Sequence, residues 1–223
     1  MNFQGTAGRS RLDAETVNRG TFNVDVDGVF LGTSLTNEGE INIADGASFN
    51  VGNSLVNDGT VSGGGTLQLG NLTTFFGGEL EPGSEIGALT IAGDIEFAAD
   101  ALLNIELGGT QQILEYDLLA INGDLELDGL LQVSLVDDFA DSILSSDTFT
   151  ILTVSNSLIG TFDGVLDNEQ LITSDGTGAF TVNYSGSDVI LSNYITIAVP
   201  EPSGTVLLAM VFGLGAFRRK RSL

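Results

Sequence analysis

An asparagine followed two residues later by a glycine recurs three times early in the chain. The copies are Asn18-Arg19-Gly20, Asn37-Glu38-Gly39 and Asn57-Asp58-Gly59, at intervals of 19 and 20 residues. Each glycine is followed by a short extended run: TFNV, EINI or TVSG. One turn of a parallel β-solenoid needs about 20 residues, and stacked turns place like residues over like. The repeat therefore predicts a solenoid with a ladder of asparagine and glycine, two residues that suit left-handed corners.

A second repeat follows, because the pattern of residues 91–97 returns at 121–127 and that of 102–107 returns at 130–135. Apolar and polar residues alternate in each copy, which predicts strands with one buried face. The segment Glu81–Ile91 resembles the PG-x-S-x-G-x-LTI pattern between turns of autotransporter passenger β-helices, except that Glu85 replaces a small or polar residue. This resemblance, over about residues 57–135, also implies a β-helix.

These patterns predict an all-β chain. We expect a disordered or truncated N-terminus at residues 1–15 and a right-handed parallel β-helix at 16–145. At 146–198 we expect longer antiparallel strands that either cap the last turn or form a small separate sandwich. A hairpin turned at Ser185-Gly186-Ser187 would cover the open edge of the stack.

The charge of the chain is strongly negative and unevenly distributed. It has 30 Asp and Glu, 7 Lys and Arg, and a net charge of -23, with no positive side chain between residues 20 and 217. Such a body repels polyanions, so we predict no nucleic-acid partner. Because the carboxylates are numerous, we expect weak, diffuse Ca²⁺ binding instead of a cofactor site. The chain has no His, Cys or Trp, so most side chains that perform catalysis are absent.

Near its end the chain carries an uncharged, mostly apolar run of 13 residues, 205–217. As a helix the run would span about 20 Å, less than a hydrocarbon core of about 30 Å, so we expect a short transmembrane helix that anchors marginally or temporarily. The basic cluster that follows consists of Arg218, Arg219, Lys220 and Arg221. The positive-inside rule predicts that this membrane-stop cluster lies in the cytoplasm.

The residues before this run are Val199, Pro200, Glu201, Pro202 and Ser203, which include two of the 3 prolines of the chain. Proline favours an exposed, extended segment here. The order Pro-Glu-Pro, apolar span, basic cluster resembles the PEP-CTERM sorting signal over about 25 residues. The resemblance implies processing by exosortase, a membrane-embedded enzyme of Gram-negative bacteria that make extracellular polysaccharide. It also implies a location in the envelope, cell surface or matrix after transient insertion in the inner membrane, with the C-terminus cytoplasmic.

The first residues, MNFQGTAGRSRLDAET, lack the basic and apolar regions of a signal peptide. For an exported substrate we therefore expect either a misplaced translation start or further sequence upstream.

Two short acidic runs resemble the start of an EF-hand calcium loop. They are Asn23-x-Asp25-x-Asp27-Gly28 and Asp124-x-Glu126-x-Asp128-Gly129. At position twelve, where the loop requires glutamate, stand Ser34 and Leu135. We therefore interpret both runs as solvent faces of strands, and we predict no metal, cofactor-binding or catalytic residue.

Taken together, the patterns predict an exported structural or adhesive protein of the cell surface or matrix, with extracellular polysaccharide as a further partner. The alternative is a carbohydrate-active enzyme on the same scaffold, since a glycoside hydrolase needs only two carboxylates, such as Asp137 and Asp138. A carbohydrate- or ice-binding module would need a flat row of threonine or aromatic residues at the turn period, and the sequence displays no such row.

Overall fold

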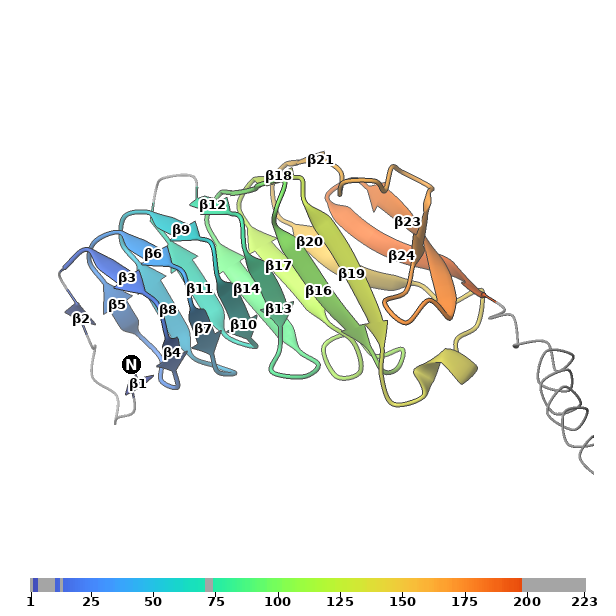
Figure 1. Cartoon of the computed structure of the whole chain (residues 1–223), viewed down its shortest axis with the longest axis horizontal. Coiled ribbons are helices and arrows are strands. Elements are labelled where there is room, and N and C mark those ends of the chain that lie inside the picture. The colour runs from blue at the N-terminus through green and yellow to red at the C-terminus, as the bar shows by residue number, and fades with distance from the viewer. Residues whose placement is uncertain (1, 4–10, 13, 71–73, 198–223) are drawn as a thin grey trace, which may run out of the picture.

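The computed structural model describes residues 2–3, 11–12, 14–70 and 74–197. Strands of successive turns lie side by side along an elongated stack (Figure 1). The prediction of an all-β, solenoid-like chain is confirmed, and these segments contain no helix long and apolar enough to cross a membrane. The helix expected at 205–217 lies outside the described residues.

Three sheets, named A, B and C here, form the sides of the stack, and successive strands along the chain enter them in rotation. Sheet A contains β1 (Asn2–Phe3), β4 (Thr21–Val24), β7 (Glu40–Ile43), β10 (Thr60–Gly63), β13 (Glu79–Pro82), β16 (Leu102–Leu107) and β19 (Leu130–Leu135). Sheet C contains β3 (Thr16–Asn18), β6 (Leu35–Asn37), β9 (Leu55–Asn57), β12 (Thr74–Phe76), β15 (Ile95–Phe97), β18 (Leu125–Leu127) and β21 (Leu158–Gly160).

Sheet B is the longest of the three sheets. It contains β2 (Arg11–Leu12), β5 (Val29–Leu31), β8 (Ser48–Val51), β11 (Thr66–Leu69), β14 (Ala88–Ala92), β17 (Leu118–Asn122), β20 (Phe149–Val154), β24 (Asp188–Thr196), β23 (Gly178–Ser185) and β22 (Gln170–Ile172). Strands β1 and β2, which lie within residues 1–15, pair in parallel with β4 and β5. Part of the N-terminal segment therefore belongs to the stack.

The interior consists of apolar side chains aligned from turn to turn. The alternation predicted for residues 102–107 is confirmed, since inward residues of β16 are buried and the others are partly exposed. Strand β16 pairs residue for residue with β19, and Ile91 pairs with Ile121, so both copies of the second repeat are adjacent turns. Stacking like on like removes an aliphatic row from water on each sheet, which supplies most of the stability.

The C-terminal strands continue sheet B with a change of direction. Strand β20 is parallel to β17 and antiparallel to β24, and β23 is antiparallel to both of its neighbours, β24 and β22. The β23–β24 hairpin closes where Ser185 pairs with Asp188. The ring of Phe149 packs edge-on against Tyr116, Phe139 and Phe180, with centroids 5.3, 5.9 and 5.7 Å away. Phe139 belongs to η1 (Phe139–Asp141), a single 3-10 turn.

Candidate functional site

The predicted sorting signal, Val199 to Ser203, and the basic cluster, Arg218 to Arg221, lie outside the described residues. The sorting signal therefore stays a prediction from sequence. Within the described part of the chain, three features combine polar groups from several turns: the asparagine ladder, an acidic cleft on sheet A, and the outer face of sheet B.

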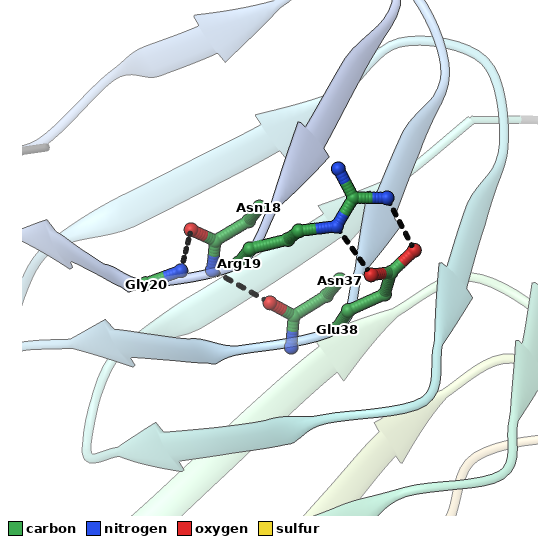
Figure 2. A network of polar contacts seen from close by, with 5 residues as sticks. All are labelled: Asn18, Arg19, Gly20, Asn37 and Glu38. Carbon is green, nitrogen blue, oxygen red and sulfur yellow. Dashed lines mark hydrogen bonds and ion pairs between the residues drawn. The ribbon is translucent and has the colours of Figure 1, made fainter.

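The three repeated asparagines form a hydrogen-bonded ladder across sheet C. The Nδ2 of Asn18 donates to Oδ1 of Asn37 at 2.7 Å, as Figure 2 shows, and Nδ2 of Asn37 donates to Oδ1 of Asn57 at 2.7 Å. Asn37 and Asn57 are fully buried. In the next turn Phe76 occupies the stacked position, followed by Phe97. The ladder therefore ends where the interior row becomes aromatic, and its side-chain amides have a structural role, since they join successive turns by hydrogen bonds.

The repeated glycines stack directly over one another, as the sequence predicts. The amide of Glu40 donates to the carbonyl of Gly20 at 2.9 Å, and that of Thr60 donates to Gly39 at 2.8 Å. The expected reason, a left-handed corner, is wrong, because none of these glycines has a positive φ. A Cβ on Gly39 or Gly59 would instead collide with the carbonyl oxygen of the glycine one turn before. Glycine is required by this close approach of backbones.

Beside the ladder, Arg19 forms an ion pair with Glu38 of the next turn, with Nε and Oε2 2.7 Å apart (Figure 2). Both side chains are largely exposed, at 72% and 41%. The glutamate raises the pKa of the Arg19 guanidinium through its hydrogen bond and its charge. An exposed pair of this kind adds little to stability.

The acidic runs that resemble calcium loops make hydrogen bonds that order turns. Asp27 accepts a hydrogen bond from the Ser48 hydroxyl. Oδ1 of Asp124 accepts from the amide of Ser157 at 3.1 Å. Oδ1 of Asp128 accepts from the amide of Gly129 at 2.8 Å. Across the described residues, no group of three or more carboxylates has an arrangement that could hold a metal ion.

Asp137 and Asp138, the carboxylates considered for hydrolysis, lie in the exposed turn that leads into η1. Both have positive φ, at 54° and 57°. Aspartate tolerates this conformation better than most residues do. The two side chains belong to a surface turn, and neither lines the cleft described next.

A cleft of about 260 Å³ lies on the outer side of sheet A. Its wall combines β13, β16 and β19 with the loop that follows β13. The polar side chains that line it are Glu81, Ser84, Glu85, Asn104, Glu106, Asp117, Gln132 and Ser134. Asn104 donates from Nδ2 to carboxylates of Glu79 and Glu81. The cleft is therefore rich in hydrogen-bond acceptors and has no positive side chain.

Asp117, which directly precedes β17, lines this cleft and is only 2% exposed. Its Oδ1 accepts a hydrogen bond from the amide of Gly87 and its Oδ2 from the amide of Glu106, each at 2.8 Å. The carboxylate thus ties the loop after β13 to strand β16. Burial raises the pKa of Asp117 to about 7, against the lowering effect of the two amides.

The second carboxyl with a raised pKa in the cleft is that of Glu81. Burial is the main cause, the charge of Glu79 adds to it, and the hydrogen bond from Asn104 opposes it. Two carboxyls with raised pKa values could exchange hydrogen bonds with a hydroxyl-bearing ligand, as acceptors when ionised and as donors when protonated. Both oxygens of Asp117 are already engaged with the backbone, so its first role is to position the loop.

Comparison of the chain with protein-family models, with curated proteins and with solved structures finds no match. The cleft was not predicted from the sequence, because Glu81 of β13, Glu106 of β16 and Asp117 of the loop before β17 share no motif and come together only in the folded stack.

Proposed function

We propose that this chain is an exported structural and adhesive protein of the cell surface or matrix. In this proposal an exosortase-like enzyme recognises Val199, Pro200, Glu201, Pro202 and Ser203, and the Arg218 to Arg221 cluster halts export. The observation that carries the structural role is the continuous stack of turns, joined by the buried asparagine ladder. Repeated turns make an elongated body whose exposed sheet faces can present the same chemistry over several strands.

Two further properties support this role. The acidic body favours solubility outside the cell and repels like-charged polymers. We also infer a right-handed coil, because connections between parallel strands are right-handed in nearly all proteins. A rigid, acidic rod held first in the membrane and then released fits a protein that spaces or joins components of a matrix.

Sorting is tested in the native cells. Surface protein from wild-type cells should lack the Arg218–Leu223 end when its terminal peptide is identified by mass spectrometry, and P200A/E201A/P202A should remain in the inner membrane. A matched triple alanine variant in the exposed 155–157 turn, S155A/N156A/S157A, should sort as wild type. Surface protein with an intact end, or normal sorting of the motif variant, would contradict the proposal.

The structural role has its own test in the same cells. Deletion of the gene should weaken cohesion of the matrix or attachment to a surface, and a wild-type copy should restore it. Unchanged cohesion and attachment in the deletion strain would argue against this role even if sorting proceeds as expected.

A carbohydrate-active enzyme is the second candidate, and the acidic cleft is the observation that favours it. In this alternative Asp117 would act as a general acid, since burial raises its pKa to about 7, and Glu81 would be the second carboxylate. Purified protein would then release reducing sugar ends from a neutral polysaccharide, and Asp117→Asn would abolish the release. No release by the wild type would exclude this candidate for the polymers tested.

A further inference from the structure

Six strands of sheet B differ from the other two sheets in the charge of their outer face, and Asp188 of β24, which pairs with Thr153, marks the C-terminal limit of this uncharged region. The six successive strands β5, β8, β11, β14, β17 and β20 contain no Asp, Glu, Lys or Arg. Outward positions of sheet A carry Glu40, Glu79, Glu81 and Glu106, and those of sheet C carry Glu96 and Glu126. In a chain with 30 acidic residues, an uncharged side that covers several turns is a distinct surface.

The outward residues of this side form two rows along the stack. The first row is Ser48, Thr66, Thr90, Ala120 and Thr153, and the second, which follows Phe30 of β5, is Asn50, Gln68, Ala92 and Asn122. We call these nine residues the uncharged face. All nine are partly or fully exposed. Neighbouring strands are about 4.8 Å apart, so small polar groups recur at a regular spacing.

The row of hydroxyls is the feature that sequence analysis did not find. The sequence separation between consecutive members increases from turn to turn, because loops of different length join the strands. No fixed period therefore marks Ser48, Thr66, Thr90 and Thr153 as a row. Parallel pairing nevertheless aligns them, since the register depends on the strands and not on the loops.

Most polar groups of this face are available to a ligand. Within the described chain, the side chains of Thr66, Gln68, Thr90, Asn122 and Thr153 make no hydrogen bond to other protein groups. At the N-terminal end of the face the side chains are engaged: Ser48 donates to Asp27, and Nδ2 of Asn50 donates to the carbonyl of Val29 at 3.4 Å. The free donors and acceptors are thus concentrated on β11, β14, β17 and β20.

We propose that the uncharged face binds a neutral polysaccharide, a ligand class that deepens the adhesive role proposed above and rests on it. Hydroxyl and amide groups pair with sugar hydroxyls as both donors and acceptors. The methyl groups of threonine and alanine contact the apolar faces of sugar rings. A polymer of identical units meets the regular rows at several points at once, so weak contacts add up.

The charge distribution favours a neutral polymer over the other classes of partner. A polyuronate would approach a face bordered by carboxylates on sheets A and C without a cation to neutralise it. A stable protein interface depends on a central cluster of aromatic or arginine anchors. Phe30 is aromatic and in line with the second row, but it lies at the N-terminal end beside Asn50 and not at the centre of the face. Neutral sugars carry no charge that requires an oppositely charged partner, and the free hydroxyl and amide groups of the face can form hydrogen bonds with them.

Binding is tested with the purified full chain in 0.15 M salt. The probes are insoluble cellulose, β-1,3-glucan, mannan and starch, with alginate beads as the anionic comparator. The expected result is depletion of the protein from solution by at least one neutral polymer and none by alginate. Depletion by none of the four neutral polymers, or equal depletion by alginate, would overturn the proposal.

Two sets of variants locate the binding surface. T66E/T90E places carboxylates in the first row and should lower the partition coefficient about tenfold, because each carboxylate must be desolvated against the polymer. Thr36→Glu makes the same change on the outer side of sheet C and should stay within about twofold of wild type. Unchanged binding by T66E/T90E would overturn the assignment to this face.

If T66E/T90E does not fold, as judged by circular dichroism, the binding of T66V/T90V to the same polymers tests the proposal instead. Valine keeps the strand preference and the shape of threonine but removes the hydroxyl. Binding by this variant should weaken several-fold, and wild-type binding would overturn the proposal. The outcome is separable from the proposed sorting, because export of P200A/E201A/P202A is measured in cells and does not depend on polysaccharide affinity.

Discussion

Replacing Asn37 by alanine should destabilise the stack more than any exposed polar substitution. Asn37 is fully buried, and its Nδ2 contacts Oδ1 of Asn57 at 2.7 Å and the carbonyl of Thr60 at 3.1 Å. Its Oδ1 accepts from Asn18 at 2.7 Å. The substitution N37A leaves Oδ1 of Asn57, itself fully buried, without the donor that it has in the native ladder.

The magnitude follows from these contacts. An unsatisfied buried polar atom costs about 1–3 kcal/mol, and loss of the further hydrogen bonds adds about 1 kcal/mol. The expected loss in the free energy of unfolding is therefore about 3 kcal/mol, which corresponds to a fall of about 6–12 °C in melting temperature for a chain of this size. Asn53, whose side chain is exposed and donates to Ser34, provides the matched control: N53A should cost less than about 0.5 kcal/mol.

Urea unfolding followed by circular dichroism measures both variants. Because turns of a stack unfold partly independently, amide hydrogen exchange at Asp58 and Thr60 should localise the loss to the turns around the ladder. The double variant N37L/N57L should lose less than the sum of N37L and N57L, since removing both partners leaves fewer unpaired groups. Equal stability of N37A and N53A would refute the view that the ladder joins the turns.

Three further outcomes are expected. Gly59→Ala should lower the free energy of unfolding by more than about 2 kcal/mol, because a Cβ at this position would collide with the backbone of Gly39. Gly20→Ala is the control and should change it little, because the space around Gly20 is open. Equal effects of the two substitutions would contradict the contact between Gly59 and Gly39. Thr74→Val should raise the free energy of unfolding by about 1 kcal/mol, since the buried Thr74 hydroxyl, between Leu55 and Ile95, has no hydrogen-bond partner among the residues that the structure describes; a loss of stability would contradict this. Stability should also rise as pH falls: Asp117 has a pKa of about 7 in the fold, above that of the unfolded chain, so its contribution is present below pH 4 and is lost as pH rises through 7. The change from pH 8 to pH 4 is about 4 kcal/mol for this group, and Asp117→Asn should flatten the profile by that amount; identical profiles would show that Asp117 is not the cause.

Local features of the sequence were sufficient to predict the stack. Period-two alternation in residues 102–107 and 130–135 marks strands with one buried face, and each strand is short enough for its own residues to decide this. The Asn-x-Gly repeat predicted the alignment of Gly20, Gly39 and Gly59 along the stack, because stacked turns place the same residue type at equivalent positions. The reason for glycine was not predictable, since the collision of a Cβ with the preceding turn depends on the distance between backbones and not on the conformation of the glycine.

The candidate sites depend on the tertiary structure. Glu81 and Glu106 come from strands β13 and β16 and Asp117 from the loop before β17, and only the folded stack buries Asp117 and raises its pKa. The uncharged face likewise has no period in the sequence, because loop length varies while strand register is kept. Sequence by itself determined which residues point inward, since burial of apolar side chains is decided strand by strand. The outward rows belong to no single strand, so only the register between turns decided which polar groups became neighbours.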